Sequence, residues 1–313
     1  MNHRSVWISV FVAALVGGVP TDDVAVAGGN EVLAELLDVG VPVAEGVRVR
    51  LPRATMPDGL DAEAQHNVLV EVARPRRTVA ALTRNSVVTP FVLDVKKVAG
   101  AGGGSRARRI DLWFVAYGRM EEVANRDFLK QLAGAAERKT PGELPTEWHV
   151  FEPPELAERG IRLTTEGPHH EMYFHSTFPL LDRVLIRATR HAMSSRSDDS
   201  ILLAARLDKR FVGDKAYPNL WRPITLDELG KPRLGPETPY THAGFYVKAT
   251  QLHEPAGALF IEYHQVYEEP KAWFHGANLL RSKLPLIVQD AVRKFRRRLK
   301  KARHAASSED KNG

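Results

Sequence analysis

Gly244-Phe-Tyr-Val-Lys-Ala-Thr-Gln-Leu252, a short linker and then Ala258-Leu-Phe-Ile-Glu-Tyr-His-Gln-Val-Tyr267 form the stretch that decides the fold. Both runs are rich in β-branched and aromatic residues, which favour a pleated, half-buried strand. In the linker, Pro255 fixes φ and Gly257 permits a positive φ, a combination typical of a turn. The sequence therefore predicts an antiparallel hairpin.

A long amphipathic helix is expected after this hairpin. Pro270 ends the second strand, because proline cannot donate a hydrogen bond to a ladder. Apolar residues then recur at steps of three and four, which predicts one apolar stripe along a helix: Leu280, Leu284, Ile287 or Val288, Ala291, Phe295, Leu299 and Ala302. The helix starts near Ala277 or near Ser282. Pro285 suits the first turn of the later start and kinks the helix of the earlier one.

The rest of the chain supplies further strands and shorter helices. N-cap residues and helical spacing predict helices over 31–37, 61–72 and 119–132. Runs of β-branched and aromatic residues predict strands over 86–95, 109–117, 171–178, 183–193 and 201–208. Residues 211–241 are rich in proline and glycine, so an irregular excursion is expected there.

The order of these elements resembles the helix-grip fold of the START lipid-transfer domains. At the last junction, the acidic turn Glu268-Glu-Pro270 precedes Trp273, and Asn278 and Pro285 follow before a basic amphipathic helix. The likeness covers about 60–303 in element order and 244–303 in residue pattern. It implies an α+β fold in which a curved antiparallel sheet packs on the long C-terminal helix. It also implies a tunnel between sheet and helix for an apolar ligand.

The N-terminus is typical of an export signal. Val6 to Val19 is apolar, is too short to span a membrane comfortably, and follows His3 and Arg4. Ala25-Val-Ala27 is a small-x-small cleavage candidate. We therefore expect a signal peptide over 1–27 and an exported protein, with an uncleaved anchor as the alternative. The remaining chain is expected to form an extension over 28–59, one domain over 60–304 and a disordered tail over 305–313.

The positive charge of the chain is concentrated at one place. The net charge is +6, yet segment 293–303 alone carries eight basic residues and no acid, which leaves −2 for the remainder. A nucleic-acid-binding protein would spread its positive charge more widely, so no specific nucleic-acid partner is expected. The segment is either a solvated helix end or a contact for an anionic membrane surface. Its basic residues are Arg293, Lys294, Arg296, Arg297, Arg298, Lys300, Lys301 and Arg303.

The hairpin also carries the best candidates for ligand contacts. Glu262 and His264 are two residues apart on one strand and share a face, and Lys248 on the partner strand is expected across from them. Facing a cavity, they would contact a polar ligand or exchange protons with it. The alternative is an exposed, charged sheet face. Tyr263 and Trp273 complete the candidate ligand-binding set.

The densest group of potential metal ligands is Pro168-His-His-Glu-Met-Tyr-Phe-His175. On a strand, His169, Glu171 and His175 share a face, which suits either a divalent metal site or a polar strand face. The spacing has one residue more than His-Glu-x-x-His, which excludes that helical protease site.

Other catalytic and cofactor motifs are missing from the sequence. The chain has no cysteine, which excludes disulfides, thiolate nucleophiles and thiolate zinc ligands. Gly100-Ala-Gly-Gly-Gly104 lacks the Gly-Lys-Ser/Thr of a phosphate-binding loop and the third glycine of a dinucleotide fingerprint, so no cofactor is predicted. The sequence favours an exported, non-enzymatic protein that binds or carries a lipid or another apolar or amphipathic molecule. The alternatives are an exported metal-assisted hydrolase and an envelope-associated interaction protein held by its basic helix.

Overall fold

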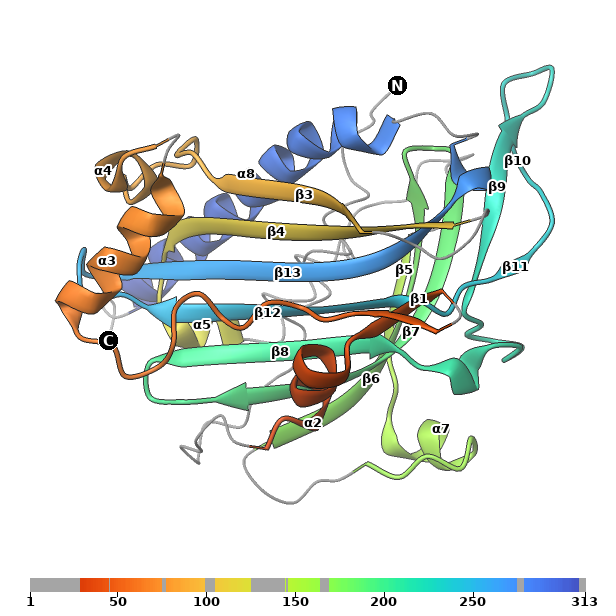
Figure 1. Cartoon of the computed structure of the whole chain (residues 1–313), viewed down its shortest axis with the longest axis horizontal. Helices are drawn as coiled ribbons and strands as arrows, with labels where there is room; N and C mark the ends of the chain where they lie inside the picture. Colours follow the sequence, from red (N-terminus) through yellow and green to blue (C-terminus); the bar gives the residue numbers. More distant parts are fainter. Residues whose placement is uncertain are drawn as a thin grey trace.

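A computed structural model describes residues 29–44, 46–74, 77–98, 105–124, 144, 146–163, 169–274 and 279–309. It is an α+β structure in which a large antiparallel sheet has the C-terminal helix on one face and N-terminal segments on the other (Figure 1). Several expectations concern parts of the chain outside these ranges, namely the signal peptide over 1–27, the glycine-rich loop, the second half of the 119–132 helix, and Asn278.

The main sheet contains eleven strands among the described residues. Its strands are β3 (Val92–Val98), β4 (Ser105–Tyr117), β5 (Glu147–Val150), β6 (His169–Leu180), β7 (Val184–Arg196), β8 (Ser200–Leu207), β9 (Leu220–Leu226), β10 (Pro232–Leu234), β11 (Thr238–Pro239), β12 (Ala243–Gln251) and β13 (Ala258–Pro270). They follow the order β10-β9-β7-β8-β12-β13-β4-β3, while β6 pairs with β7, β5 with β6 and β11 with β9. Along one edge of β7, residues 184–187 pair with β9 and residues 190–196 pair with β8. The sheet therefore divides at β7, and β9 to β11 form a separate arm (Figure 1).

Two predicted elements differ from the structure along this sheet. Residues 211–241, expected to be irregular, form the short strands β9, β10 and β11. The strand expected over 86–95 starts only at Val92, because turns occupy 86–90. The hairpin is confirmed: β12 and β13 pair antiparallel from Ala243↔Tyr267 to Gln251↔Leu259, and Gly257 adopts a φ of 71° in the turn.

Within the described residues, every helix except the last is short. The helices are α2 (Glu31–Ala34), which continues into a π-helical turn over Glu35–Val39, α3 (Ala62–Ala73), α4 (Val79–Leu82), α5 (Met120–Ala124), α7 (Pro153–Ala157) and α8 (Leu279–Glu309). The expected N-caps are confirmed, because the side chain of Asn30 accepts from Leu33 N and that of Asp61 accepts from Ala64 N. No helix in the described part of the chain is long and apolar enough to span a membrane.

Helix α8 packs on the sheet through the predicted stripe. Its buried residues share one core with the inward-facing residues of β4, β6, β7, β8, β12 and β13: Leu280, Leu284, Val288, Ala291, Val292, Phe295 and Leu299. The helix already includes Leu279, so a start at Ser282 is wrong and Pro285 lies inside the helix. It continues to Glu309, into the segment expected to be a polar tail.

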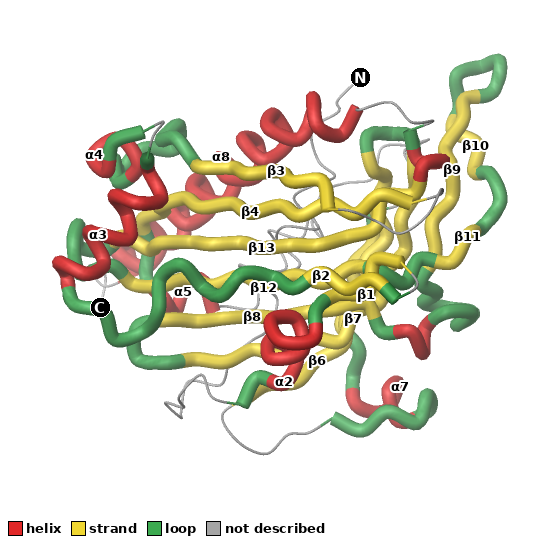
Figure 2. The backbone as a smooth tube through the Cα atoms, in the orientation of Figure 1, coloured by secondary structure: helices red, strands yellow, loops and turns green. Residues whose placement is uncertain are grey.

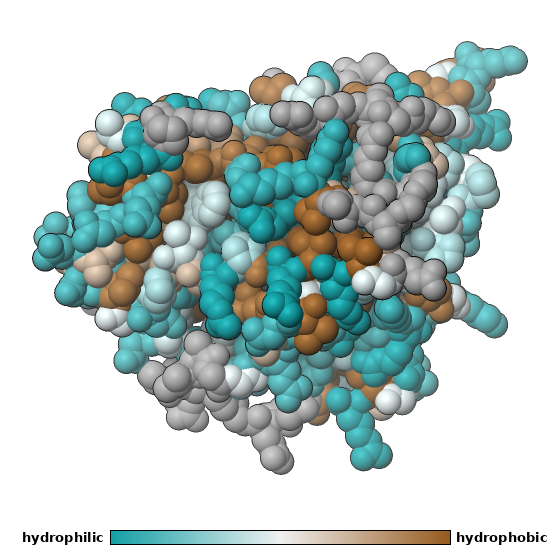
Figure 3. Space-filling model, in the orientation of Figure 1, coloured by the Kyte–Doolittle hydropathy of each residue, from teal (hydrophilic) through white to brown (hydrophobic). Residues whose placement is uncertain are grey.

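The opposite face of the sheet is covered by the segment expected to be an N-terminal extension. Residues of α2 and of the small hairpin β1 (Val41–Ala44) and β2 (Val47–Val49) pack with Leu202, Ala204, Tyr246 and Val266 of the sheet. Residues 51–60, here named the covering loop, then run across the sheet to α3 (Figure 2). Hydrophilic side chains form most of the outer surface on this side of the molecule (Figure 3).

Candidate functional site

The five candidate ligand residues do not converge, because they lie on opposite faces of the sheet, between which successive residues of β13 alternate. Glu262, His264 and Lys248 lie beneath the covering loop. Tyr263 and Trp273 belong to the core on the α8 side. The structure therefore contains two separate polar groupings where the sequence suggested one.

Beneath the covering loop, two carboxylates hold one imidazole. His264 Nδ1 lies 2.8 Å from Asp111 Oδ1, and His264 Nε2 lies 3.2 Å from Glu262 Oε2. Glu262 and His264 are both 0% exposed, so the alternative of an exposed charged sheet face is wrong. Asp111 comes from β4, the neighbour of β13, and no sequence pattern predicted this pairing.

The same grouping fastens the covering loop to the sheet. Glu262 accepts the backbone N–H of Thr55 at 2.7 Å and of Met56 at 3.3 Å. Lys248, which lies opposite Glu262 as predicted, donates to the carbonyl of Met56 at 2.6 Å and pairs with Asp58 Oδ1 at 2.6 Å. Every charged group here thus has a partner, as buried charges require.

These contacts favour the protonated form of His264. Burial alone lowers its pKa, but the hydrogen bonds and negative charges of Asp111 and Glu262 outweigh burial and raise the pKa above its ordinary value. Both ring nitrogens have hydrogen-bond partners and the ring is fully buried, so the imidazole does not reach solvent. The arrangement is that of a structural anchor.

The second grouping, on the α8 side, surrounds a buried arginine. Arg190 is 3% exposed and donates to Ser176 Oγ at 2.7 Å and to the carbonyl of Ala188 at 3.3 Å. Its guanidinium lies 5.6 Å from the ring centroid of Phe174. No described carboxylate lies within ion-pair distance, and burial lowers the pKa of Arg190 to about 10. Arg190 was not among the predicted site residues, although alternation from Val184 through Ala188 places it on the inward face.

Tyrosines face this arginine. Burial raises the pKa of Tyr240 and of Tyr263, and the charge of Arg190 opposes part of both increases. The hydroxyl of Tyr267 and the Nε1 of Trp273 are buried without a hydrogen-bond partner among the described residues. Tyr263 and Trp273 are thus buried core residues here, with the Trp273 ring 5.4 Å from that of Tyr240.

Two of the three candidate metal ligands on β6, His175 and Glu171, have other partners. His175 is buried between Thr189 Oγ1 at 2.8 Å and Thr177 Oγ1 at 3.1 Å, and its pKa is lowered to about 3, mainly by burial. Glu171 lies 2.7 Å from His191 Nε2. The ring of His169 lies against Gly29. Within the described ranges no group of three acidic or histidine residues could hold a metal ion.

The basic helix end is not uniformly exposed. Arg297, Lys300 and Lys301 are exposed, while Arg293, Lys294, Arg298 and Arg303 are half-buried. Arg296 is only 5% exposed, so its assignment as a contact for an anionic surface is wrong. Its side chain turns inward because it donates to the carbonyls of Val115 at 2.8 Å, Pro90 at 3.3 Å and Thr89.

An open groove lies between α8 and the edge strand β3. Its volume is about 940 Å³, and the end of α3 forms part of its rim. The apolar lining residues are Val72, Ala73, Val88, Pro90, Phe91, Val92, Leu93, Trp113, Pro285, Leu286 and Val292. The charged lining residues are Arg74, Arg77, Arg293 and Arg296 with Glu71 and Asp94. The groove therefore combines apolar walls with a net positive rim.

A wall separates this groove from the buried histidine. Trp113 Nε1 donates to Thr55 Oγ1 at 2.9 Å, and both residues line the groove. Behind them, the Trp113 ring meets His264 edge-on at 5.3 Å. Thr55 and Trp113 thus face the groove, while Glu262 and His264 remain covered.

No protein-family model matches the chain, and no curated protein sequence matches it.

Proposed function

We propose that this protein is an exported, non-enzymatic binding or carrier protein for an amphipathic molecule with an anionic head group. The molecule would lie in the groove between β3 and α8. The single observation that carries the proposal is this groove, which joins apolar walls to a cationic rim at the junction of sheet and C-terminal helix. Its volume of about 940 Å³ falls within the range of roughly 300–1,000 Å³ common for small-molecule sites.

The apolar walls support the apolar part of the ligand. Val88 and Leu286 line the groove and are each 60% exposed. Large hydrophobic side chains left in water gain free energy when an apolar molecule covers them. An alkyl chain along the groove would cover both of them.

The charges at the rim support the anionic head. Four arginines and two acids line the groove, which leaves an excess of two positive charges. Arg296 strengthens this field, because its described contacts are neutral carbonyl oxygens and a ring rather than a carboxylate. A cationic or zwitterionic amphiphile would lose this attraction.

Binding is favoured over catalysis by the surroundings of the titratable groups. Asp111, Glu262 and His264 are hydrogen-bonded to one another and covered, and His175 is hydrogen-bonded to two threonines. A general base must reach the proton that it removes. None of these groups lines the groove.

The test is palmitate binding to the purified protein, followed by displacement of a fluorescent fatty acid. Leu286→Glu introduces a charge into the apolar wall and should weaken palmitate binding at least tenfold. Leu226→Glu is the matched control, because Leu226 is 61% exposed on β9, away from the groove, against 60% for Leu286. Equal affinities for the two variants, or no palmitate binding by the unaltered protein, would overturn the proposal.

Export needs its own test. Residues 1–27 fused to a reporter enzyme should carry the reporter out of the cytoplasm, and replacement of Val10 and Leu15 by arginine should retain it inside. A reporter that stays inside with the unaltered segment would contradict the export part of the proposal and leave the groove untouched.

A further inference from the structure

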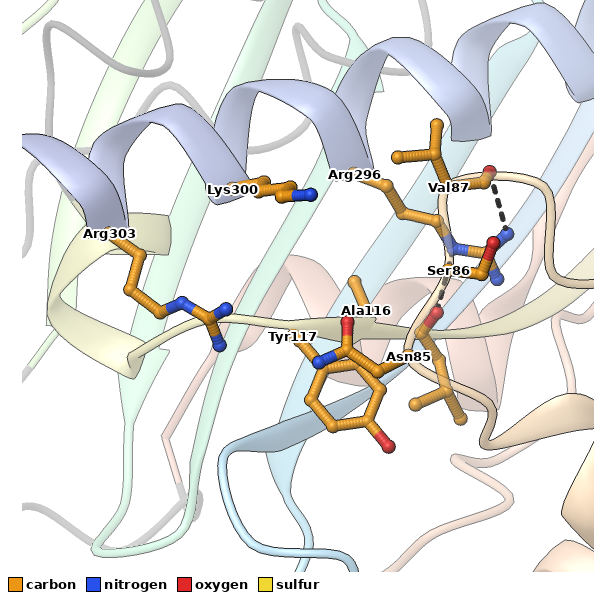
Figure 4. Close-up of a pocket in the computed structure, with 9 residues that line it drawn as sticks. Asn85, Ser86, Val87, Ala116, Tyr117, Arg296, Lys300 and Arg303 are labelled. Carbon is orange, nitrogen blue, oxygen red and sulfur yellow. Dashed lines mark hydrogen bonds between the residues drawn. The ribbon is translucent and has the colours of Figure 1, made fainter.

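A small basic pocket lies beside the groove, on the other side of Arg296. It is formed by α8, the end of β4 and residues 85–87, and its volume is about 50 Å³ (Figure 4). Its lining residues are Asn85, Ser86, Val87, Val115, Ala116, Tyr117, Arg296, Lys300 and Arg303. Three of these carry positive charge and none carries negative charge.

The three cations come from one face of α8. Arg296, Lys300 and Arg303 follow at steps of four and three, so they stand above one another and their side chains extend toward the same side (Figure 4). Like charges at these spacings repel each other. An anion held by Arg296 and Lys300 beside residues 85–87 would offset the repulsion between these two.

Arg296 is fixed in place without being neutralised. Its guanidinium donates to the carbonyls of Val115 and Val87, drawn as dashed lines in Figure 4, and to those of Thr89 and Pro90. It also lies 5.5 Å from the ring centroid of Phe114. These partners satisfy its N–H groups but supply no negative charge, and burial lowers the pKa of Arg296 to about 10. The pocket therefore has a pre-positioned charge that still lacks a counter-ion among its lining residues.

The size and lining of the pocket suit a small polyatomic anion. A water molecule needs roughly 10–15 Å³ of such space, so about 50 Å³ accommodates a group of several heavy atoms. Besides the cations, Asn85 and Ser86 line the space with polar side chains, whereas the Tyr117 hydroxyl donates to the carbonyl of Thr83. Donors from several directions match a tetrahedral oxyanion with three terminal oxygens better than a planar carboxylate.

The pocket and the groove adjoin each other. Arg296 lines both, Ser86 and Val87 line the pocket, and Val88 to Pro90 line the groove. A molecule with its alkyl chain in the groove therefore has a cationic pocket within reach of its head.

We propose that this pocket binds a phosphate group, namely the head of a phosphate-bearing amphiphile whose chain occupies the groove. This inference rests on the proposed function and specifies its ligand class. Lys300 supplies a mobile charge to the phosphate, and Arg296 supplies a fixed one.

The experiment compares lysophosphatidate, monoacylglycerol of the same chain and inorganic phosphate by isothermal titration calorimetry. The unaltered protein should bind lysophosphatidate at least tenfold more tightly than monoacylglycerol, and inorganic phosphate should bind weakly. Lys300→Glu should abolish this preference and leave monoacylglycerol affinity within twofold. Lys301→Glu is the matched control, since Lys301 is an exposed neighbour on α8 that does not line the pocket; it should retain the preference within threefold.

Each of the other possible results contradicts a specific part of the proposal. Equal affinity for lysophosphatidate and monoacylglycerol would overturn the phosphate pocket and leave the groove standing. Equal losses in Lys300→Glu and Lys301→Glu would overturn the pocket in favour of diffuse attraction to the helix. Binding of inorganic phosphate without a preference for lysophosphatidate would overturn the lipid head group and indicate free phosphate. Binding of neither lipid would overturn the proposed function itself.

Discussion

The carboxylate of Glu262 accepts the backbone N–H of Thr55 at 2.7 Å, although 207 residues separate the two in the chain. The same carboxylate also accepts from Met56 N and contacts His264 Nε2. One side chain in the middle of the sheet thus holds the covering loop and orients the buried imidazole.

Replacement of Glu262 by glutamine should strongly destabilise the protein. The single amide oxygen of glutamine cannot accept from all three neighbouring donors. The NH₂ group of the glutamine would also place a fourth donor against them. Hydrogen bonds to charged groups contribute about 1.5–3 kcal/mol each, so the free energy of unfolding should fall by about 3 kcal/mol. Urea denaturation measures this, and hydrogen exchange should show faster exchange over 51–60. Glu237→Gln, with a side chain 61% exposed, is the control; a change of similar size there would contradict the anchoring role.

Protonation of His264 should make stability depend on pH. Asp111 from β4, Glu262 beside it on β13 and Tyr246 from β12 face the ring, and the two carboxylates raise its pKa against the effect of burial. A pKa above the unfolded value of about 6.5 gives stability that is complete below pH 6.5 and is lost as pH rises through the folded pKa. The difference in urea midpoint between the unaltered protein and His264→Gln should therefore shrink from pH 6 to pH 9.

His175 provides the control for this pH dependence. Its pKa is lowered to about 3, so the ring is neutral in both the folded and the unfolded state above roughly pH 7.5. The midpoint difference for His175→Gln should be constant from pH 7.5 to pH 9. A difference for His264→Gln that does not shrink between pH 6 and pH 9 would show that His264 is not stabilised as a cation.

Neighbouring arginines on α8 should respond very differently to the same change. Arg296→Met leaves four backbone carbonyls without their donor, and unsatisfied buried polar groups cost about 1–3 kcal/mol each. Partial rehydration limits the total, and we expect a loss of about 3 kcal/mol in the free energy of unfolding. Arg297→Met, at an exposed position, should stay within about 0.5 kcal/mol of the unaltered protein. Equal losses in thermal or urea denaturation would contradict the buried position of Arg296.

Close packing of the N-terminal layer on the sheet should make Gly244 intolerant of a side chain. A Cβ at Gly244 would lie 2.6 Å from Leu36 Cδ2 and 2.8 Å from Val41 Cγ2. Gly244→Ala should cost about 1–3 kcal/mol through overpacking, and Leu36→Ala about 2–5 kcal/mol through the cavity that it creates. The double variant should lose at least about 1 kcal/mol less than the sum, because each change relieves the other. Strict additivity in urea denaturation would show that the two sites do not touch.

Local patterns in the sequence predicted the elements that depend on local chemistry. Helical spacing located the buried stripe of α8, and the caps Asn30 and Asp61 marked the starts of α2 and α3. Strand alternation also placed Lys248 opposite Glu262. These features depend on residues close together in the chain or on one turn, whose conformations are limited.

The positions of the charged groups depend on segments that are far apart in the sequence. Local sequence patterns therefore could not predict them. Arg296 resembles its basic neighbours in sequence, but the carbonyls at 87–90 and at Val115 bind it inside. Glu262 and His264 shared a face as expected, yet the covering loop, about 200 residues earlier, closes that face. The groove likewise arises from three separated segments, α3, β3 and α8.

The pairing of β4 with β13 also has a consequence for folding during synthesis. Asp111 and His264, partners in this ladder, are 153 residues apart. Ribosomes add roughly 5–20 residues per second, so β4 waits on the order of 8–30 s for the neighbour that completes it. During that interval the nascent chain offers an open strand edge to other chains. Newly made molecules should therefore depend on a holding chaperone, and their yield should fall when translation is slowed between codons 118 and 257.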